Sequence, residues 1–155
     1  MKKFLLQLTV CATALFATSA TQAAEAGSRN FYGLAPGKKF SLKVTGVVST
    51  KAGLSGGGEA PIPSGIPKFS KGQTVQFEIG KGGRLTGPKF SIPLKTADAL
   101  SSVYTGEVVG TNIPPIAVIR KNSNMRPVFA EITFYKVSGS GFSTTTNMVS
   151  YILEK

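Results

Sequence analysis

Hydrophobic and polar residues alternate along several stretches of the chain, most regularly over residues 126–137. The even-numbered residues from Val128 to Phe134 are apolar, whereas Glu131 and Thr133 lie between them. This period of two predicts a strand with one face on a core. Ser138-Gly139-Ser140-Gly141 interrupts the pattern, and residues 142–154 follow as a second extended stretch. The two stretches therefore predict a hairpin that closes the chain.

The same alternation recurs upstream. On residues 39–50 it places Phe40, Leu42, Val44 and Val48 on one face, and Gly46 predicts a bend or bulge in that strand. Further strands are expected at residues 73–79, 89–95, 103–109 and 116–120.

Two local features interrupt this series of strands. Pro93 cannot donate a hydrogen bond to a neighbouring strand, so the strand at 89–95 is expected at a sheet edge. Residues 96–102 are the one stretch compatible with a helical turn, with Thr96 as its N-cap.

The strand pattern predicts an all-β fold with glycine and proline between the strands. We expect an antiparallel β-sandwich of seven to eight strands, with a small β-barrel as the alternative, and little or no helix after the N-terminal segment. Alternation alone does not distinguish these two architectures, because a sandwich and a barrel both need strands with one apolar face.

The N-terminus has the pattern of a secretory signal peptide. Lys2 and Lys3 precede an uncharged apolar run, and small residues lead to a cleavage point after Ala23, with Ala24 as the alternative. We expect 1–23 to be removed, 24–37 to be an irregular lead-in and 38–155 to form one all-β domain that does not span a membrane. The short Lys-Lys segment and the lack of any Asn-x-Ser/Thr acceptor favour a bacterial periplasmic or secreted protein.

Glycine and proline are concentrated in residues 51–72, which we interpret as one long loop. If the protein has an element that faces a partner, this loop is the candidate. Its candidate contact residues are Gly56, Gly57, Gly58, Glu59, Pro61, Ile62 and Pro63. A connection without a binding role is the alternative interpretation.

The composition lacks the side chains that most often act in catalysis. The chain has no histidine, and its one cysteine, Cys11, lies within the predicted signal peptide. Removing 23 of 155 residues leaves a mature chain of 132 residues without a thiolate, an imidazole or a disulfide. Its carboxylates are well separated along the sequence, and no Ser-x-x-Lys spacing occurs. We therefore expect no catalytic site, no metal site and no cofactor.

The chain is strongly basic. Its formal net charge is +11, and loss of Lys2 and Lys3 leaves +9. Such a charge attracts anionic polysaccharides and lipid head groups. The candidate contacts for a polyanion are Lys39, Lys43, Lys68, Lys71, Lys89 and Lys95. Nucleic acid is not expected as a partner, because export separates the protein from it and lysine–phenylalanine neighbours on a strand point to opposite faces.

These observations favour an exported, non-enzymatic β-domain that binds a protein or glycan of the cell envelope. The alternative is a polyanion-binding protein directed at lipopolysaccharide or acidic polysaccharide. An enzyme is the least favoured interpretation, because the side chains that commonly act as bases and nucleophiles are missing.

Overall fold

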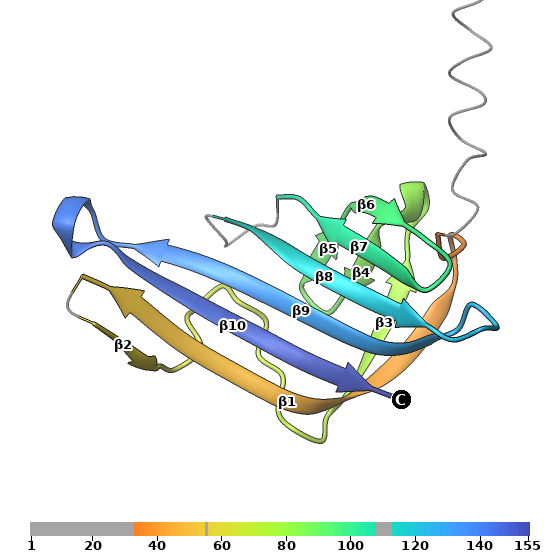
Figure 1. Cartoon of the computed structure of the whole chain (residues 1–155), viewed down its shortest axis with the longest axis horizontal. Coiled ribbons are helices and arrows are strands. Elements are labelled where there is room, and N and C mark those ends of the chain that lie inside the picture. The colour runs from red at the N-terminus through yellow and green to blue at the C-terminus, as the bar shows by residue number, and fades with distance from the viewer. Residues whose placement is uncertain (1–32, 55, 108–112) are drawn as a thin grey trace, which may run out of the picture. The chain divides into compact units, whose positions relative to one another are not determined.

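The computed structural model describes residues 33–54, 56–107 and 113–155. The predicted signal peptide and residues 24–32 of the predicted lead-in lie outside this part of the chain. The described part contains ten strands and two short 3-10 turns (Figure 1). The strands are β1 (Lys39–Gly53), β2 (Gly56–Glu59), β3 (Thr74–Ile79), β4 (Leu85–Gly87), β5 (Phe90–Ile92), β6 (Leu94–Ala97), β7 (Ser101–Thr105), β8 (Ile113–Lys121), β9 (Pro127–Ser138) and β10 (Thr145–Glu154). The 3-10 turns are η1 (Lys81–Gly83) and η2 (Gly141–Ser143).

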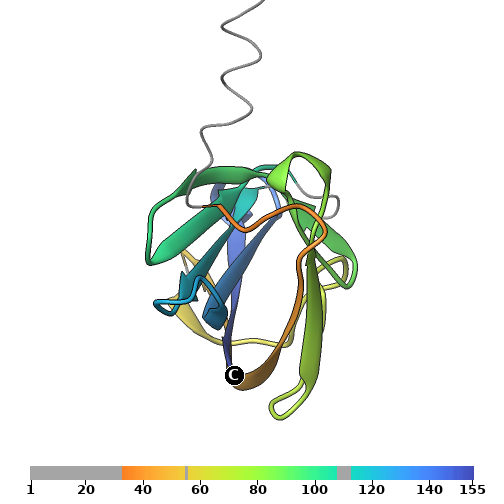
Figure 2. The same cartoon turned by 90° about the vertical axis from the view of Figure 1, so that its right-hand side faces the viewer.

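The strands form one antiparallel sheet with the order β5-β4-β3-β1-β10-β9-β8-β7-β6, and β2 pairs with β1 outside this path. Neighbouring strands along this path are consecutive in the chain, with two exceptions: β3 pairs with β1 although β2 lies between them in sequence, and β10 returns to pair with β1. The connections are therefore those of an up-and-down meander. Figure 2 looks roughly along the strands and shows the sheet curling around on itself. The predicted all-β antiparallel class is confirmed, with the sheet nearly closed into a barrel.

The barrel closes at Pro93. β5 pairs with β4, and β6, one residue later, pairs with β7 at the opposite end of the strand order. The predicted edge position is thus confirmed, but the prediction of a single strand over residues 89–95 is wrong, because Pro93 divides it into β5 and β6. The Thr105 N–H donates to the Pro93 carbonyl at 3.1 Å, and a Cβ added to Gly106 would lie 2.4 Å from the Pro93 ring. Glycine at position 106 therefore lets the chain at the end of β7 approach Pro93, which lies between β5 and β6.

The predicted bulge at Gly46 is also present, and it corrects one assignment. The register between β1 and β10 shifts between Val44 and Gly46, so β1 carries one extra residue there. One extra residue exchanges the two faces of the strand beyond it. Val47 therefore packs against the core and Val48 is exposed, which makes the expectation that Val48 faces inward wrong.

A second correction concerns residues 96–102. Thr96 is not a helix cap: it lies in β6, opposite Val103 of β7. The turn that follows is organised by the Asp98 carboxylate, which accepts hydrogen bonds from the backbone N–H groups of Leu100 and Ser101 at 2.7 Å each. Pairing with β7 gives backbone partners that a single isolated helical turn would lack.

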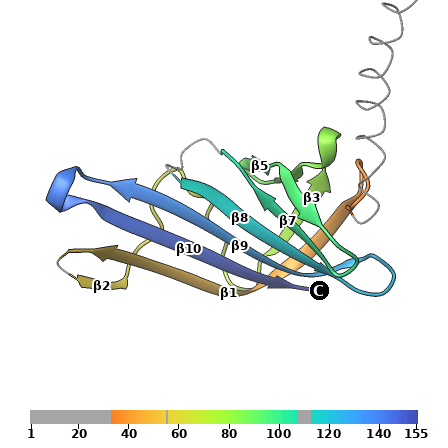
Figure 3. The same cartoon turned by 45° about the horizontal axis from the view of Figure 1, so that its top comes forward.

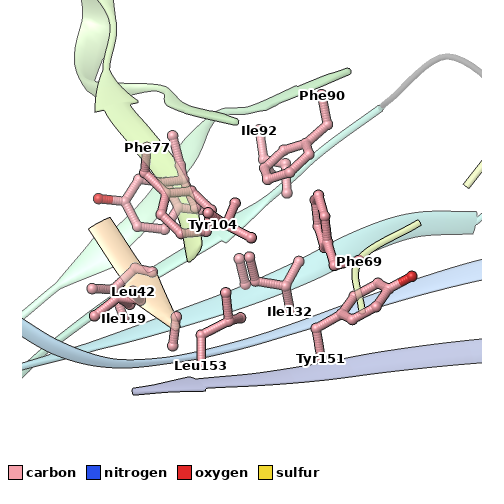
Figure 4. Packing of buried hydrophobic residues seen from close by; sticks show 14 of the residues in the cluster. Leu42, Phe69, Phe77, Phe90, Ile92, Tyr104, Ile119, Ile132, Tyr151 and Leu153 are labelled. Atoms are coloured by element: carbon pink, nitrogen blue, oxygen red, sulfur yellow. The ribbon is translucent and has the colours of Figure 1, made fainter. Parts of the chain in front are cut away.

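Side chains from facing walls fill the barrel interior (Figure 4). Phe90 of β5 makes an edge contact with Phe134 of β9, with ring centroids 5.5 Å apart. The Phe134 ring centroid in turn lies 6.3 Å from that of Tyr151 of β10. Phe77 extends this aromatic series on the other side of Phe90. The core is therefore continuous across the barrel, as expected for a small barrel of about eight strands.

Candidate interaction surface

Three strands of the barrel continue past it as a flat extension, which we call the blade (Figures 1 and 3). The blade consists of β2, residues 50–53 of β1, residues 135–138 of β9 and residues 145–148 of β10. Its pairing is regular, with Gly53 opposite Thr145 and Thr145 opposite Ser138 at the far end.

The first half of the candidate loop is part of this blade, which corrects the assignment of residues 51–72 to a single loop. Residues 51–53 belong to β1, and Gly56–Glu59 form β2, paired in register with Thr50 to Gly53. All four residues of β2 are exposed. Within the described residues β2 pairs with β1 alone, so its other edge presents free backbone groups.

The second half of the candidate loop is held against the inner face of the barrel and blade. Ile66 and Phe69 are buried in the core, and the Tyr151 hydroxyl donates to the Pro67 carbonyl at 2.5 Å (Figure 4). Of the candidate residues, Pro61 is exposed, whereas Ile62 and Pro63 are half-buried. Residues 60–73 are therefore a covering segment of the core and not a free connection.

A row of polar side chains crosses the inner face of the blade behind its far end. Lys51 of β1 is opposite Asn147 of β10, which is opposite Lys136 of β9. Residues directly opposite one another share a face of the sheet. The Lys136 ammonium donates to the Ser64 carbonyl at 2.7 Å, which identifies this face as the one under the covering segment. Sequence analysis missed this row, because it depends on the register of three strands.

The far end of the blade carries two exposed apolar side chains, which we call the blade tips. Phe142 lies in η2, between β9 and β10, and is 92% exposed. Leu54 follows the last residue of β1 and is 79% exposed. Sequence analysis did not single out either residue, because alternation patterns assign faces within strands and say little about turns.

The six candidate polyanion contacts do not form one patch. Lys39 and Lys43 lie on β1, and the Lys39 ammonium is 3.6 Å from a Glu78 carboxylate oxygen. Lys68 and Lys71 belong to the covering segment. β3 and β4 separate β1 from Lys89, which lies in the β4–β5 turn, and Lys95 lies on β6 at the other end of the strand order. An exposed ion pair such as Lys39–Glu78 contributes little to stability, but it lowers the positive charge available at that point.

The most deeply buried polar groups lie inside the barrel. Ser102 and Tyr104 are fully buried on the same face of β7, and neither hydroxyl makes a hydrogen bond of good geometry with any described residue. Burial raises the pKa of Tyr104 to about 12, and the neighbouring Ser102 hydroxyl opposes that rise weakly. At neutral pH Tyr104 is therefore a protonated phenol.

At one end of the barrel, the Lys121 ammonium donates to the Asp98 backbone carbonyl at 2.6 Å. Burial lowers the pKa of Lys121, and the Asp98 carboxylate raises it by a smaller amount. The pKa of Asp98 itself is lowered, chiefly by the backbone N–H groups of Leu100 and Ser101. These contacts fix the turn between β6 and β7, and we assign them a structural role.

One motif escaped the sequence analysis. Residues 53–57, Gly-Leu-Ser-Gly-Gly, have the Gly-x-Ser-x-Gly spacing of a nucleophile elbow. That elbow requires a strand-to-helix turn and a histidine base, whereas these residues connect two antiparallel strands in a chain without histidine. Ser55 itself lies outside the described residues. The spacing therefore does not indicate a hydrolase.

Within the described ranges no three histidine, cysteine, aspartate or glutamate side chains gather in a way that could hold a metal ion. Among the same residues there is no helix long and apolar enough to cross a membrane. Comparison of the chain with protein-family models, with curated proteins and with solved structures finds no match.

Proposed function

We propose that this protein is an exported, non-enzymatic binding module of the cell envelope, and that the blade is its contact surface. The observation that supports this most directly is the position of Phe142 and Leu54, at 92% and 79% exposure, at the end of an extension that reaches past a filled barrel. Large apolar side chains exposed together mark interaction sites more often than isolated ones do.

The barrel then acts as the support. Its interior is filled by side chains from opposite walls, and the covering segment continues that core onto the inner face of the blade. Phe142 and Leu54 lie in connections directly at the ends of paired strands, which restrict their position more than a long free loop would.

Photo-crosslinking tests this proposal. A photoreactive residue would be placed in the processed protein at Ala52 or Phe142 on the blade, and at Leu100 or Lys95 on the barrel as controls. Each of these four positions is exposed. We expect saturable binding to isolated cell envelopes, with adducts from the blade positions and none from the controls. Equal adducts from both regions, absence of saturable binding, or turnover of a substrate would each overturn the proposal.

Salt dependence separates this function from the polyanion alternative. Binding carried by dispersed surface lysines would fall steeply between roughly 0.1 and 1 M salt, because such charges are screened over a few ångströms at the higher concentration. Binding through the blade should fall less, because salt does not screen the contribution of its two exposed apolar side chains. Replacing Lys89 and Lys95 with glutamine gives the matched control, because both lie outside the blade.

A further inference from the structure

The two blade tips lie at the same end of the blade. Gly53, the last residue of β1, is opposite Thr145, the first residue of β10. Leu54 follows the former, and Phe142 precedes the latter by three residues. Figures 1 and 3 both show the β9–β10 turn and the end of β1 together at the far end of the blade. An exposed aromatic and an exposed aliphatic side chain therefore lie at the same end of the blade.

The sequence around the tips contains no charge. Residues 52–58 and residues 137–153 include no aspartate, glutamate, lysine or arginine, and serine, threonine and glycine surround Phe142. A charged group at the tips would have to lose its hydration on entering an apolar medium, at a large cost in free energy. Hydroxyl groups can instead hydrogen-bond to polar head groups at a membrane surface.

Two lysines lie near the far end of the blade, each two residues before the end of its strand. Lys51 and Lys136 flank Asn147 in the row across the inner face. Glu59 is the one carboxylate among the blade residues defined above, and it is opposite Thr50, one position along β1 from Lys51 and therefore on the other face. The chain as a whole carries a net charge of +11. This distribution complements an anionic surface, because basic residues near such a surface are attracted within a Debye length.

A narrow end with two large apolar side chains also favours a lipid surface over a folded protein as the partner. Stable protein–protein interfaces bury about 800 Å² on each partner, which requires a broad surface. Insertion at a membrane interface needs only apolar side chains that reach past the polar surface and basic groups that remain at the head groups.

We propose that the blade tips insert into the head-group region of an anionic lipid bilayer, with Phe142 and Leu54 entering the apolar boundary and the exposed Lys51 facing the phosphates, while Lys136 stays bound to Ser64 behind it. This inference rests on the proposed function and names the chemistry of the partner of the same surface.

Protein-free vesicles provide the test. The processed protein would be sedimented with vesicles of phosphatidylglycerol and phosphatidylethanolamine, and with vesicles of phosphatidylcholine alone. We expect binding to the anionic vesicles and weak binding to the neutral ones. The double variant Leu54→Ser and Phe142→Ser should bind anionic vesicles at least roughly tenfold less tightly, because it loses the transfer of two apolar side chains out of water.

Leu100→Ser is the matched control, because Leu100 is also an exposed leucine, at 69%, but lies in the turn between β6 and β7 on the barrel. It should leave vesicle binding unchanged. All three substituted positions are exposed, so thermal unfolding of each variant should match that of the parent protein. Lys51→Glu should weaken binding to anionic vesicles and leave the weak binding to neutral ones unchanged.

Tryptophan fluorescence reports insertion directly. The chain has no tryptophan, so Phe142→Trp introduces a single probe at one tip. Its emission should shift to shorter wavelength when anionic vesicles are added, whereas that of Leu100→Trp should not. An acidic polysaccharide such as heparin should produce no such shift, because it offers charge without an apolar layer.

Two results would overturn the lipid inference. One is vesicle binding that the double tip variant retains in full, and the other is no binding to anionic vesicles at all. If blade positions still crosslink to whole envelopes while protein-free vesicles are not bound, the proposed function stands and its partner is a protein or glycan. If neither envelopes nor vesicles are bound, both proposals fail.

Discussion

In the barrel, the inner faces of β1, β9 and β10 pack against side chains from the opposite wall, whereas in the blade the same strands have only the covering segment against one face. Phe134 illustrates the first situation, since Phe90 lies across the barrel from it. Lys136, two residues further along β9, instead reaches the backbone of Ser64. One strand thus passes from an enclosed apolar interior to a partly covered, polar surface within two positions.

The outer face of β1, β9 and β10, in contrast, has similar side chains in the barrel and in the blade. No described segment covers it. Val48 of β1 is 45% exposed there, and Ile113 and Ile116 of the neighbouring β8 are 39% and 42% exposed. Thr133 and Ser150 share a hydroxyl–hydroxyl hydrogen bond of 2.7 Å on the same face. The comparison teaches that stability is concentrated in the barrel, whereas the blade retains exposed apolar groups that stability does not require. The following predictions test that division.

The largest effect is expected in the barrel core. Phe134→Ala removes a fully buried ring that contacts Phe90 and Tyr151, so it should lower the free energy of unfolding by ~3–5 kcal/mol. Phe142→Ala removes the same group from a blade tip and should change it by less than about 0.5 kcal/mol. Urea unfolding of both variants measures the difference. Similar losses would show that the blade tip is packed in solution.

A somewhat smaller effect is expected at the covering segment. Ile66→Ala should cost ~2–5 kcal/mol, because Ile66 is buried beneath the barrel wall together with Phe69. Pro61→Ala, an exposed position earlier in the same segment, should be nearly neutral. Thermal unfolding distinguishes them. A neutral Ile66→Ala would mean that residues 60–73 are a loose connection after all.

The smallest effect depends on pH. Burial raises the pKa of Tyr104 from 10.0 to about 12, so above pH 10 the unfolded chain releases this proton while the folded chain retains it. The free energy of unfolding should therefore fall as pH rises from 10 towards 12, by at most ~1.4 kcal/mol per pH unit for this group. Below pH 10 both states are protonated, and the group adds no pH dependence.

Tyr104→Phe should remove this part of the alkaline loss. At neutral pH it should leave stability unchanged or slightly higher, because the hydroxyl has no good hydrogen bond to lose. Burial also raises the pKa of Tyr151, so some alkaline loss should remain in the variant. Denaturant unfolding at about pH 9 and about pH 11 measures both effects. If the free energy of unfolding of Tyr104→Phe falls with pH as steeply as that of the parent protein, Tyr104 is not the source of the alkaline loss.

Local patterns were sufficient for much of the barrel. The alternation Val75, Phe77, Ile79 predicts the inner face of β3, and Ala130, Ile132, Phe134 predicts that of β9; all six residues are buried. They could be assigned because no bulge interrupts either run. Val48 could not be assigned, because the bulge at Gly46 exchanges the faces of β1 and its exact position is set by pairing with β10.

Less of the candidate surface could be predicted from the sequence. The glycines of β2 have the composition of a loop, yet β1 is long enough to offer them a pairing edge. Ile62, Ile66 and Phe69 are spaced irregularly among prolines and glycines, so nothing periodic indicates that this segment covers the core. Phe142 lies in a turn, where burial depends on what the rest of the chain places nearby.

The amino-acid sequence by itself determined the all-β class, the antiparallel pairing of most neighbours and the absence of histidine and of any cysteine beyond Cys11, because these follow from local alternation, short connections and composition. The tertiary structure alone decided that the sheet nearly closes at Pro93, that residues 60–73 cover the core, and that Leu54 and Phe142 lie at the same end of the blade. Those features depend on contacts between residues far apart in the chain, and periodicity within a strand carries no information about them.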